Sequence, residues 1–391
     1  MARALAFTWQ LTEIHGWGLV GVHTALYLVD QGEPPLLLEK PVLSSLRPRN
    51  RERLEGLLGP YEQAAAFAAR NPDRVLKLAG LDVLHALSNG FHAGPASARF
   101  RGERDIGVIA YEDTRLTAEV LERARPYRRI IVHSTFNKAL LETKGFVNVG
   151  LAFQGIDETE MQPLPPAGRF PGRFAIFSGG KLEFRKGQDI VLAAFRIFRE
   201  RHPEALLVTA WQNVWAHLAL SMGESAHTPV PPRIDGQSRV MIAAWAADNG
   251  VPADAFVDLG FLRREQIAPV LADCQAAVFP NRCEGATNLV AMEAMACGVP
   301  CVLSANTGHL DLMHGDVCFP LTEQAAVPDP DGSRIGWGES SVEEVVDRLE
   351  AIHADRERAR RKAEEALAFV RRERTWRAFA EAFVREIRIG D

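Results

Sequence analysis

The sequence has little of several features, and each shortage excludes a class of protein. Only five cysteines are present, all between Cys274 and Cys318 and with no Cys-x-x-Cys pair, which argues against a disulfide framework or a cysteine zinc site. The net charge of −5 leaves no broad basic surface, so we expect no nucleic-acid partner. No apolar run approaches the length of a membrane span, and the N-terminus lacks the layout of a signal peptide. We therefore expect a cytoplasmic protein in a reducing compartment.

What is present is the composition of an ordinary globular protein. The chain has 391 residues, of which 47% are apolar and 24% are charged, which is enough for two or three domains. Short apolar runs alternate with helical patterns, as is typical of α/β folds with parallel sheets. The clearest linker is the proline-rich stretch 163–168. We therefore predict one domain at 1–168 and a second at 169–373.

The stretch 283–300 is the most informative part of the chain. It follows an apolar run that predicts a buried strand, and Thr287 or Asn288 can cap the helix that comes next. That helix is apolar on every side except at Glu293, which is typical of a buried helix. A buried carboxylate needs hydrogen-bond donors, and the helical neighbours of Glu293 offer none. The pattern therefore predicts a ligand or a local donor at Glu293.

A second carboxylate, Glu284, precedes this helix. It lies in a loop at the carboxyl end of the predicted strand, the edge of an open α/β sheet at which ligands bind. Free backbone N–H groups near Asn288 would favour an anion there. A nucleotide sugar fits this arrangement, with its diphosphate at the helix N-terminus and its hydroxyl groups donating to Glu284 and Glu293. The alternative is a structural helix whose glutamate binds local backbone.

A glycine-rich basic loop follows a predicted strand at 174–178. Glycines such as Gly180 let a backbone approach a phosphate, and Lys181 and Lys186 can close on the phosphate from both sides of the loop. Solvation of both lysines is the simpler interpretation. The loop is therefore a candidate phosphate site.

The N-terminal part carries Gly16, Gly18 and Gly21 at the spacing of dinucleotide-binding proteins, with Glu39 about twenty residues further on. This pattern keeps open an NAD-dependent oxidoreductase. The loop before Gly16 is longer than a dinucleotide fold uses. We favour instead a loop around Gly16, Trp17 and Gly18 that lies near a phosphate or an acceptor.

Four arginines, Arg47, Arg49, Arg51 and Arg53, lie close together on a polar helical stretch. A solvated face is the simpler interpretation. The sharper alternative is contact with an anionic membrane or a lipid-linked acceptor. Peripheral contact at the inner face of a membrane therefore stays open.

Both motif regions resemble those of glycosyltransferase family 4, the retaining GT-B enzymes. The run Glu293-Ala-Met-Ala-Cys-Gly-Val-Pro is similar to the family's acidic signature, and the loop from Gly180 to Gly187 is similar to its basic loop. The resemblance covers most of residues 105–391 and is weak before them. It implies an α/β protein of GT-B fold, with two Rossmann-like domains facing across a cleft. It also implies that a terminal helix, 374–391, packs back on the N-terminal domain.

The resemblance also assigns roles to residues. It implies that Glu284 contacts the donor sugar, that Glu293 contacts the ribose, and that Lys181 and Lys186 hold the diphosphate. It places Glu112 at the reaction centre, whereas the structural alternative is that Glu112 caps the helix that follows it. The implied donor-binding residues are Gly180, Lys181, Lys186, Glu284, Gly285, Thr287, Asn288, Leu289 and Glu293.

Two departures from the family pattern stand out. Eight residues separate Glu284 from Glu293, one more than the family's usual spacing. Lys181 replaces an arginine, so the charge is kept but the planar bidentate fork is lost. The turn that touches the sugar and phosphate must therefore differ from that of relatives.

The implied activity is transfer of a hexosyl group from a nucleotide-diphosphate sugar to an acceptor, with retention of the anomeric configuration. The acceptor would be a glycan, a lipid-linked sugar or a small molecule, as in polysaccharide biosynthesis. We expect no cofactor and no obligatory metal, and the sequence shows no histidine cluster at metal spacing. Lys181, Lys186 and the helix N-terminus must then neutralise the leaving diphosphate. A catalytically silent nucleotide-sugar-binding protein remains a further alternative, and nothing in the sequence indicates an oligomeric state.

Overall fold

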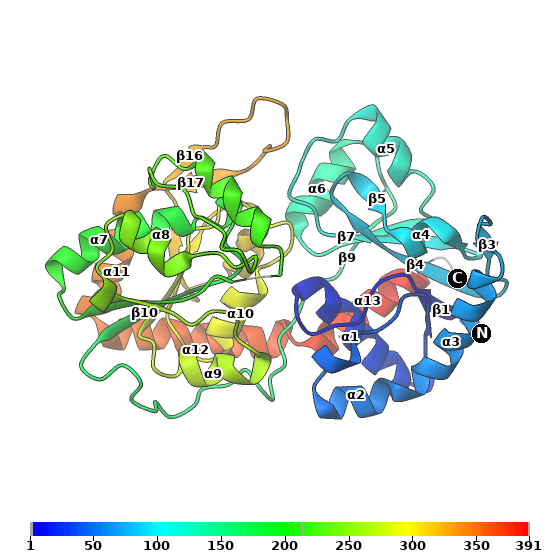
Figure 1. The fold of residues 1–391 in the computed structure, drawn as a ribbon, viewed down its shortest axis with the longest axis horizontal. Helices are drawn as coiled ribbons and strands as arrows, with labels where there is room; N and C mark the ends of the chain where they lie inside the picture. Colours follow the sequence, from blue (N-terminus) through cyan, green and yellow to red (C-terminus); the bar gives the residue numbers. More distant parts are fainter. Residues whose placement is uncertain (1–2, 213, 390–391) are drawn as a thin grey trace. The chain divides into compact units, whose positions relative to one another are not determined.

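The computed structural model describes residues 3–212 and 214–389, which form two compact units (Figure 1). Unit 1 comprises the chain up to Gly155, the segment Asp329–Ile335 and the chain from Trp376 onward. Unit 2 comprises Ile156–Pro328 and Gly336–Thr375. Each unit has its own sheet and its own core.

Unit 1 is built on a sheet with the strand order β2-β1-β4-β7-β8-β9, in which these neighbours are parallel and β5 pairs antiparallel with β4. Its strands are β1 (Ala4–Phe7), β2 (Leu36–Leu37), β4 (Leu81–Ser88), β5 (His92–Ala93), β7 (Asp105–Ile109), β8 (Arg129–Val132) and β9 (Val149–Leu151), and a separate pair is β3 (Leu76–Lys77) and β6 (Phe100–Arg101). Its helices are α1 (Gly16–Asp30), η1 (Leu43–Ser45), α2 (Pro48–Leu54), η2 (Glu55–Leu57), α3 (Leu58–Ala69), η3 (Asn89–Phe91), α4 (Pro95–Arg99), α5 (Ala118–Ala124), α6 (Thr135–Thr143) and α13 (Trp376–Arg388).

Helix α1 begins earlier than the sequence pattern suggested. Gly16, Trp17 and Gly18 form its first turn, and His15 caps it by accepting the N–H of Gly18 on Nδ1 at 3.0 Å. The expected loop at Gly16, Trp17 and Gly18 is therefore wrong. The side chain of His15 supplied a cap that we had not recognised, because histidine is not among the usual capping residues.

The glycines of α1 have a packing reason. A Cβ on Gly18 would lie 2.3 Å from the backbone oxygen of Thr12, and one on Gly21 would lie 1.9 Å from Nε1 of Trp9. No side chain fits at either position, so the helix approaches the preceding segment closely only with glycine there. The glycine spacing is explained without a dinucleotide.

The last helix of the chain belongs to unit 1. Helix α13 packs against α1, and the ring of Trp376 stacks on that of His23 with centroids 4.6 Å apart. Glu386 of α13 forms an ion pair with Arg129 at the start of β8. Helix α13 is thereby part of unit 1, although all of unit 2 precedes it in the sequence.

Arg47 and Arg53 of the arginine cluster pair with carboxylates. Arg47 lies 3.1 Å from Glu13, and Arg53 lies 2.5 Å from Asp30. Both pairs lie within unit 1, so two of these arginine charges are neutralised by neighbouring carboxylates.

The boundary between the units falls at Gly155 and Ile156, earlier than the expected break at 168–169. The N–H of Ile156 donates to the backbone oxygen of Arg374 at 2.8 Å, and its side chain is buried in the core of unit 2. Further along, the N–H of Gly168 donates to Oδ1 of Asp273 at 2.8 Å. The chain is therefore attached to unit 2 on both sides of the exposed prolines.

Unit 2 contains an all-parallel sheet with the strand order β12-β11-β10-β13-β14-β15. These strands are β10 (Phe174–Gly179), β11 (Ala205–Ala210), β12 (Phe256–Asp258), β13 (Ala276–Phe279), β14 (Cys301–Ser304) and β15 (Phe319–Leu321), and a separate hairpin is formed by β16 (Gln324–Ala326) and β17 (Gly338–Ser340). Its helices are η4 (Phe184–Lys186), α7 (Gln188–Arg201), η5 (Ala216–Glu224), α8 (Ile242–Asp248), η6 (Ala253–Ala255), α9 (Arg264–Leu271), α10 (Leu289–Ala296), η7 (Thr307–Leu312), α11 (Val342–Ala354) and α12 (Arg356–Glu373).

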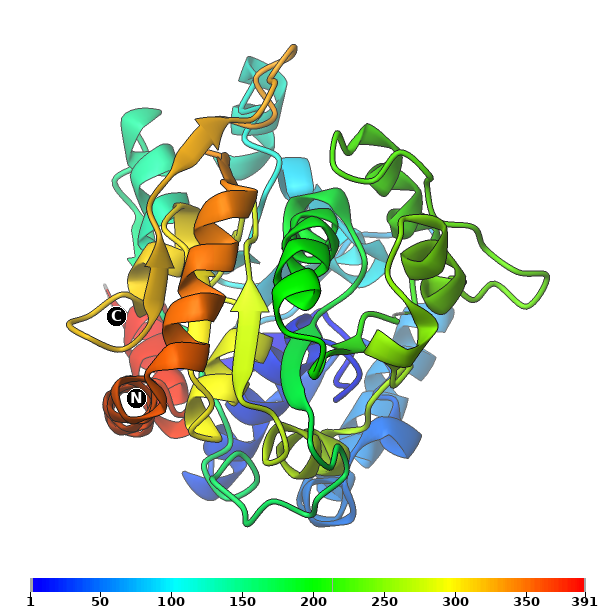
Figure 2. The same cartoon turned by 90° about the vertical axis from the view of Figure 1, so that its left-hand side faces the viewer.

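Helices cover both faces of this sheet, and strand alternation divides the core between them. Phe174 and Ile176 of β10 are buried with residues of α7, α8 and α11, whereas Ala175 and Phe177 are buried with residues of α9, α10 and α12. Helices α7 and α11 lie side by side on the first of these faces (Figure 2). The period of two in side-chain direction thus gives each face its own apolar layer.

The segment Asp329–Ile335, between β16 and β17, belongs to unit 1. Its backbone binds Thr114, which is buried: the N–H of Thr114 donates to Ser333 at 2.9 Å, and its hydroxyl donates to Gly332 at 3.0 Å. The same hydroxyl accepts the N–H of Ile335 at 2.7 Å. One threonine therefore holds three residues of the segment.

Across residues 3–212 and 214–389, no helix combines the length and the apolar character that a membrane span requires.

Candidate donor site

Helix α10 begins at one of the two predicted caps. Asn288 has φ 60°, and its Oδ1 accepts the N–H of Ala291 at 3.3 Å. Asparagine tolerates this left-handed conformation better than most residues. Thr287, the other candidate, is fully buried, and its hydroxyl contacts the sulfur of Met292 at 3.7 Å. The prediction of a cap at Asn288 is confirmed.

A chain of hydrogen bonds holds Asn288 in place. Its Nδ2 donates to Nε2 of His309 at 3.0 Å, so the proton of this imidazole lies on Nδ1 and donates to the hydroxyl of Ser304 at 2.9 Å. Ser304 in turn donates to the backbone oxygen of Asn281 at 2.7 Å. Burial lowers the pKa of His309 to about 4, which keeps the ring neutral at pH 7. The helix start and the loop after β13 are thereby fixed to each other.

Glu284 lies in that loop and is buried, with 4% of its surface exposed. Its Oε1 accepts hydrogen bonds from Nζ of Lys186 and from Nδ2 of Asn281, and its Oε2 lies 3.3 Å from Arg185. Its backbone N–H donates to the hydroxyl of Thr307 at 2.9 Å. The structure thus brings the predicted Glu284 and Lys186 together as a buried ion pair.

The charges around Glu284 decide its ionisation. Burial would raise the pKa of this carboxyl, but the charges of Lys186 and Arg185 outweigh that effect and lower it to about 2. Burial also lowers the pKa of Lys186, and the carboxylate of Glu284 opposes that shift. Glu284 is therefore a carboxylate at any physiological pH.

Besides Lys181 and Lys186, the basic loop contains a third cation, Arg185, and a carboxylate, Glu183. Arg185 is buried, and its Nε lies 3.1 Å from Oε2 of Glu183, the same oxygen that lies 3.3 Å from Nζ of Lys181. Lys181 also stands over the ring of Trp215, 5.5 Å from its centroid. Three cations face two carboxylates here, Glu183 and Glu284, which leaves one net positive charge. That charge is the electrostatic basis for an anion site.

Glycines give this loop its shape. Gly187 has φ 70°, and a Cβ on it would lie 2.1 Å from the backbone oxygen of Pro280. Gly180 has φ 105° with open space around its Cβ position. Both need the left-handed backbone that glycine adopts without strain, and Gly187 also permits close contact with the loop after β13.

Arg282 lies in the loop after β13 and anchors it through buried ion pairs. Its guanidinium is fully buried, pairs with Asp189 at 2.7 Å and with Glu339 at 2.7 Å, and lies 3.9 Å from the centroid of the Phe184 ring. A buried charge with several partners fixes its neighbours in space. This group could not be predicted from local sequence, because Arg282 and Asp189 are far apart in the chain.

Glu293 is buried within α10 and has a partner outside its helix. The guanidinium of Arg264, the first residue of α9, binds Oε1 of Glu293. The prediction that this carboxylate needs a donor from beyond its own helix is confirmed, and the donor is an arginine side chain. Glu284 and Glu293 are held by different cations.

The other residues of the predicted donor set lie on the same short stretch. Gly285 is buried, and Leu289, the first residue of α10, is half-buried. A Cβ on Gly308 would lie 1.7 Å from the backbone oxygen of Ala286, so the turn after β14 contacts this stretch closely. The loop from Glu284 to Leu289 is therefore enclosed by its neighbours.

In unit 1, Glu112 follows β7 and is half-buried. Its N–H donates to Oδ1 of Asn89 at 3.1 Å. The next helix, α5, is capped by Thr117, so the alternative in which Glu112 caps that helix is wrong. The adjacent Tyr111 is buried, and its hydroxyl donates to the backbone of Asn137 at 2.9 Å. These contacts leave Glu112 at the carboxyl edge of the unit 1 sheet.

Two units, each built on a sheet of mainly parallel strands, are the architecture of the GT-B fold, and unit 2 carries a cationic loop beside a buried carboxylate. Solved structures show the same fold. Anabaena HepE has a TM-score of 0.64 at 15% identity, covering 99% of both chains. Sucrose-phosphate synthase from Thermosynechococcus elongatus has a TM-score of 0.65 at 16% identity, covering 99% of this chain and 98% of that one. The predicted fold class is confirmed.

The chain belongs to the family described as family 4 glycosyltransferases in conflict systems, whose model matches residues 154–383. It is also similar to YqgM of Bacillus subtilis, an uncharacterized glycosyltransferase, at 27% identity over 232 residues. That match covers 59% of this chain and 53% of YqgM, so the chain spans about half the length of this curated relative. The family that the motifs resembled is the one to which the chain belongs.

Proposed function

We propose that this glycosyltransferase moves a hexosyl group from a nucleotide-diphosphate sugar to an acceptor and retains the anomeric configuration. The observation that carries the proposal is the buried carboxylate of Glu284 against the basic loop, where three cations face two carboxylates and leave one net positive charge. A diphosphate supplies the missing negative charge, and a sugar offers hydroxyl donors to the carboxylate. The basic loop therefore complements the diphosphate of the donor, and Glu284 complements its sugar.

We assign different roles in donor binding to the residues of the basic loop and to Glu284. Lys186 and Arg185 share their charge between Glu284 and the diphosphate, which stabilises the charge that develops on the leaving group. Glu284, which is ionised and oriented by Asn281, accepts a hydrogen bond from a hydroxyl group of the donor sugar. Lys181, on the more exposed side of the loop, contacts the outer phosphate oxygens. These three cations do the neutralisation for which other transferases use a metal, so we propose that no metal is obligatory.

Retention follows from attack on the leaving-group face of the sugar. The acceptor hydroxyl forms a bond to the anomeric carbon as the bond to the diphosphate oxygen breaks. The acceptor proton passes to that oxygen, so no side chain need act as base. Glu112 contacts the acceptor, which is a glycan, a lipid-linked sugar or a small molecule.

To identify the base of the donor nucleotide, we would test UDP and UDP-sugars first. The HepE structures contain UDP with glucose, UDP alone and UDP-glucose. A panel of nucleotides and nucleotide sugars in a thermal-shift assay identifies the donor, since a ligand at about 100 times its Kd adds about 2.7 kcal/mol. Proton NMR of the product then gives the anomeric configuration. An inverted product would contradict the retaining mechanism, and binding without any transfer or hydrolysis would leave only a silent binding protein.

The two carboxylates provide the sharpest variant test. Glu284→Gln should lose transfer activity and keep affinity for the nucleoside diphosphate, because Glu284 meets the sugar. Glu293→Gln should instead weaken that affinity by roughly ten- to a hundred-fold, because a hydrogen bond to a charged group contributes about 1.5–3 kcal/mol. Equal damage to nucleoside-diphosphate affinity in both variants would show that our placement of sugar and ribose is wrong.

A further inference from the structure

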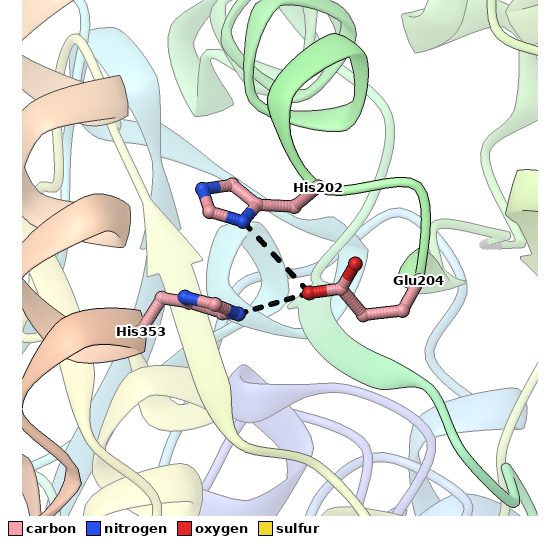
Figure 3. A group of neighbouring side chains, drawn as sticks. All are labelled: His202, Glu204 and His353. Carbon is pink, nitrogen blue, oxygen red and sulfur yellow. Dashed lines mark hydrogen bonds and ion pairs between the residues drawn. The ribbon is translucent and has the colours of Figure 1, made fainter.

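Three side chains of unit 2, those of His202, Glu204 and His353, converge on one point near the amino end of β11 (Figure 3). His202 and Glu204 come from the turn between α7 and β11, and His353 comes from the last turn of α11. Oε1 of Glu204 lies 2.9 Å from Nε2 of His353 and 3.8 Å from Nδ1 of His202, and the two imidazole centroids are 4.1 Å apart. One nitrogen from each ring and one carboxylate oxygen therefore face a common centre.

A fourth side chain sets the orientation of His202. Oε2 of Glu350 lies 2.7 Å from Nε2 of His202, and Arg201 holds the other oxygen of Glu350 at 3.2 Å. A carboxylate at Nε2 favours the proton there, which leaves the lone pair of Nδ1 directed at Glu204. Metal-binding histidines commonly donate their second ring N–H to a carboxylate in this way.

Packing restricts both rings. The ring of His353 meets that of Phe174 edge-on at 5.1 Å, and the ring of His202 lies 4.4 Å from that of Phe198. The three side chains nevertheless remain partly exposed, at 18% for His202, 41% for Glu204 and 28% for His353. The donors are held firmly, and one side is open to water.

We propose that His202, Glu204 and His353 bind a divalent transition metal, Zn²⁺ in the first instance, with water as the fourth ligand. Two imidazoles and a carboxylate are a donor set that zinc accepts, and bonds of about 2.0–2.2 Å put tetrahedral ligand atoms roughly 3.3–3.5 Å apart. The observed separations of 2.9 and 3.8 Å lie on either side of that value. Small side-chain rotations bring the donors to it.

The position of the cluster indicates a structural role. His202 and Glu204 precede β11 and thus lie at the amino edge of the sheet, whereas Glu284 and Lys186 follow β13 and β10 at the carboxyl edge. The metal would join α11 to the turn after α7, on the face where these helices pack. Two carboxylates, Glu204 and Glu350, face two cations, Arg201 and Arg356, near the cluster. The metal charge is therefore added to a locally neutral group.

The proposal is tested by zinc titration of the full chain after treatment with a chelator. Competition with a chromophoric chelator should show one Zn²⁺ per chain, and Co²⁺ should give the visible absorption of a tetrahedral site. The double variant His202→Gln/His353→Gln should bind more than about 100-fold more weakly, because it loses two ligands. His217→Gln, which changes an exposed histidine elsewhere in unit 2, is the matched control and should bind as the wild type does.

A second variant keeps the test decisive if the double variant folds poorly. Glu350→Ala leaves all three ligands in place and should weaken zinc binding by about ten- to a hundred-fold. Zinc should also raise the Tm of the wild type and not that of the double variant. Absence of stoichiometric zinc binding to the wild type, or equal affinity in the wild type, the double variant and Glu350→Ala, would overturn the proposal. The four side chains would then be ion pairs only.

Discussion

The chain contains two glycine-rich stretches of similar sequence, residues 16–21 and 180–187, but their glycines have different structural roles. In unit 1, Gly18 and Gly21 lie inside a helix and allow close contact with the preceding segment. In unit 2, Gly180 and Gly187 lie in a loop with positive φ and space three cations around two carboxylates. Gly18 and Gly21 are required because any side chain there would clash, whereas Gly180 and Gly187 are required because their φ angles are positive.

The comparison shows that glycine spacing carries little information without the charges around it. Around Gly16 to Gly21 the neighbouring side chains are aromatic and apolar, such as Trp9 and Leu11, which predict packing. Around Gly180 to Gly187 they are lysine, arginine and glutamate, which predict an anion site. The charges, and not the glycines, separate a nucleotide-binding loop from a packed helix.

The largest effect is expected from Gly187→Ala. The new Cβ would meet the backbone oxygen of Pro280 at 2.1 Å in a residue with φ 70°. Strain of about 1–2 kcal/mol and overpacking of about 1–3 kcal/mol should add, so stability and nucleoside-diphosphate affinity should both fall. Differential scanning calorimetry and isothermal titration measure the two effects. Gly180→Ala, which has strain without a clash, is the matched control and should lose less.

Lys186→Ala is expected to act on binding more than on folding. Glu284 would keep Arg185 and Asn281 as partners, whereas the diphosphate would lose a cation. Affinity for the nucleoside diphosphate should fall by roughly ten- to a hundred-fold, or about 1.5–3 kcal/mol. Lys144→Ala removes an exposed lysine of unit 1 and should change nothing. Unchanged affinity in Lys186→Ala would remove Lys186 from the donor site.

Gly18→Ala should show the opposite pattern. Its Cβ would meet the backbone of Thr12 at 2.3 Å, so unit 1 should be destabilised by about 1–3 kcal/mol. Nucleoside-diphosphate affinity should remain that of the wild type, because this glycine only packs a helix. Calorimetric titration at a temperature where the variant is folded makes the comparison. Loss of affinity without loss of Tm would mean that Gly18 serves a ligand.

The smallest effect is a difference in acid stability. The pKa of Glu284 is lowered from 4.5 to about 2, so its contribution to stability is present above pH 4.5 and is lost as the pH falls toward 2. Between about pH 5 and pH 3 the wild type should lose up to about 2 kcal/mol more than Glu284→Gln. Tm values of both proteins across this range provide the measurement. Parallel curves would contradict the lowered pKa.

Local signals were enough to predict the elements around the candidate site. The apolar run before Glu284, the cap at Asn288 and the loop from Gly180 to Gly187 lie where the pattern placed them, because each depends on neighbours within a few residues. Family membership and the α/β class rest on the same short stretches.

Partners that are distant in the sequence could not be predicted in this way. Arg264 meets Glu293 from a separate helix, and Arg282, after β13, meets Asp189 at the start of α7, because tertiary packing sets both contacts. Arg185 could have been found, since it lies between Glu183 and Lys186 in the basic loop. His353 lies 149 residues after Glu204, so no spacing rule would have joined them.

The interleaving of the two units also sets the order in which each can be completed during synthesis. Helix α13, which is synthesised after all of unit 2, packs against α1, which is synthesised before it. The segment that binds Thr114 also emerges late, after most of unit 2. Unit 2 can therefore close while the nascent unit 1 still exposes the apolar side of α1. Unit 1 can therefore be completed only after unit 2 has been synthesised, when α13 is available to pack against α1.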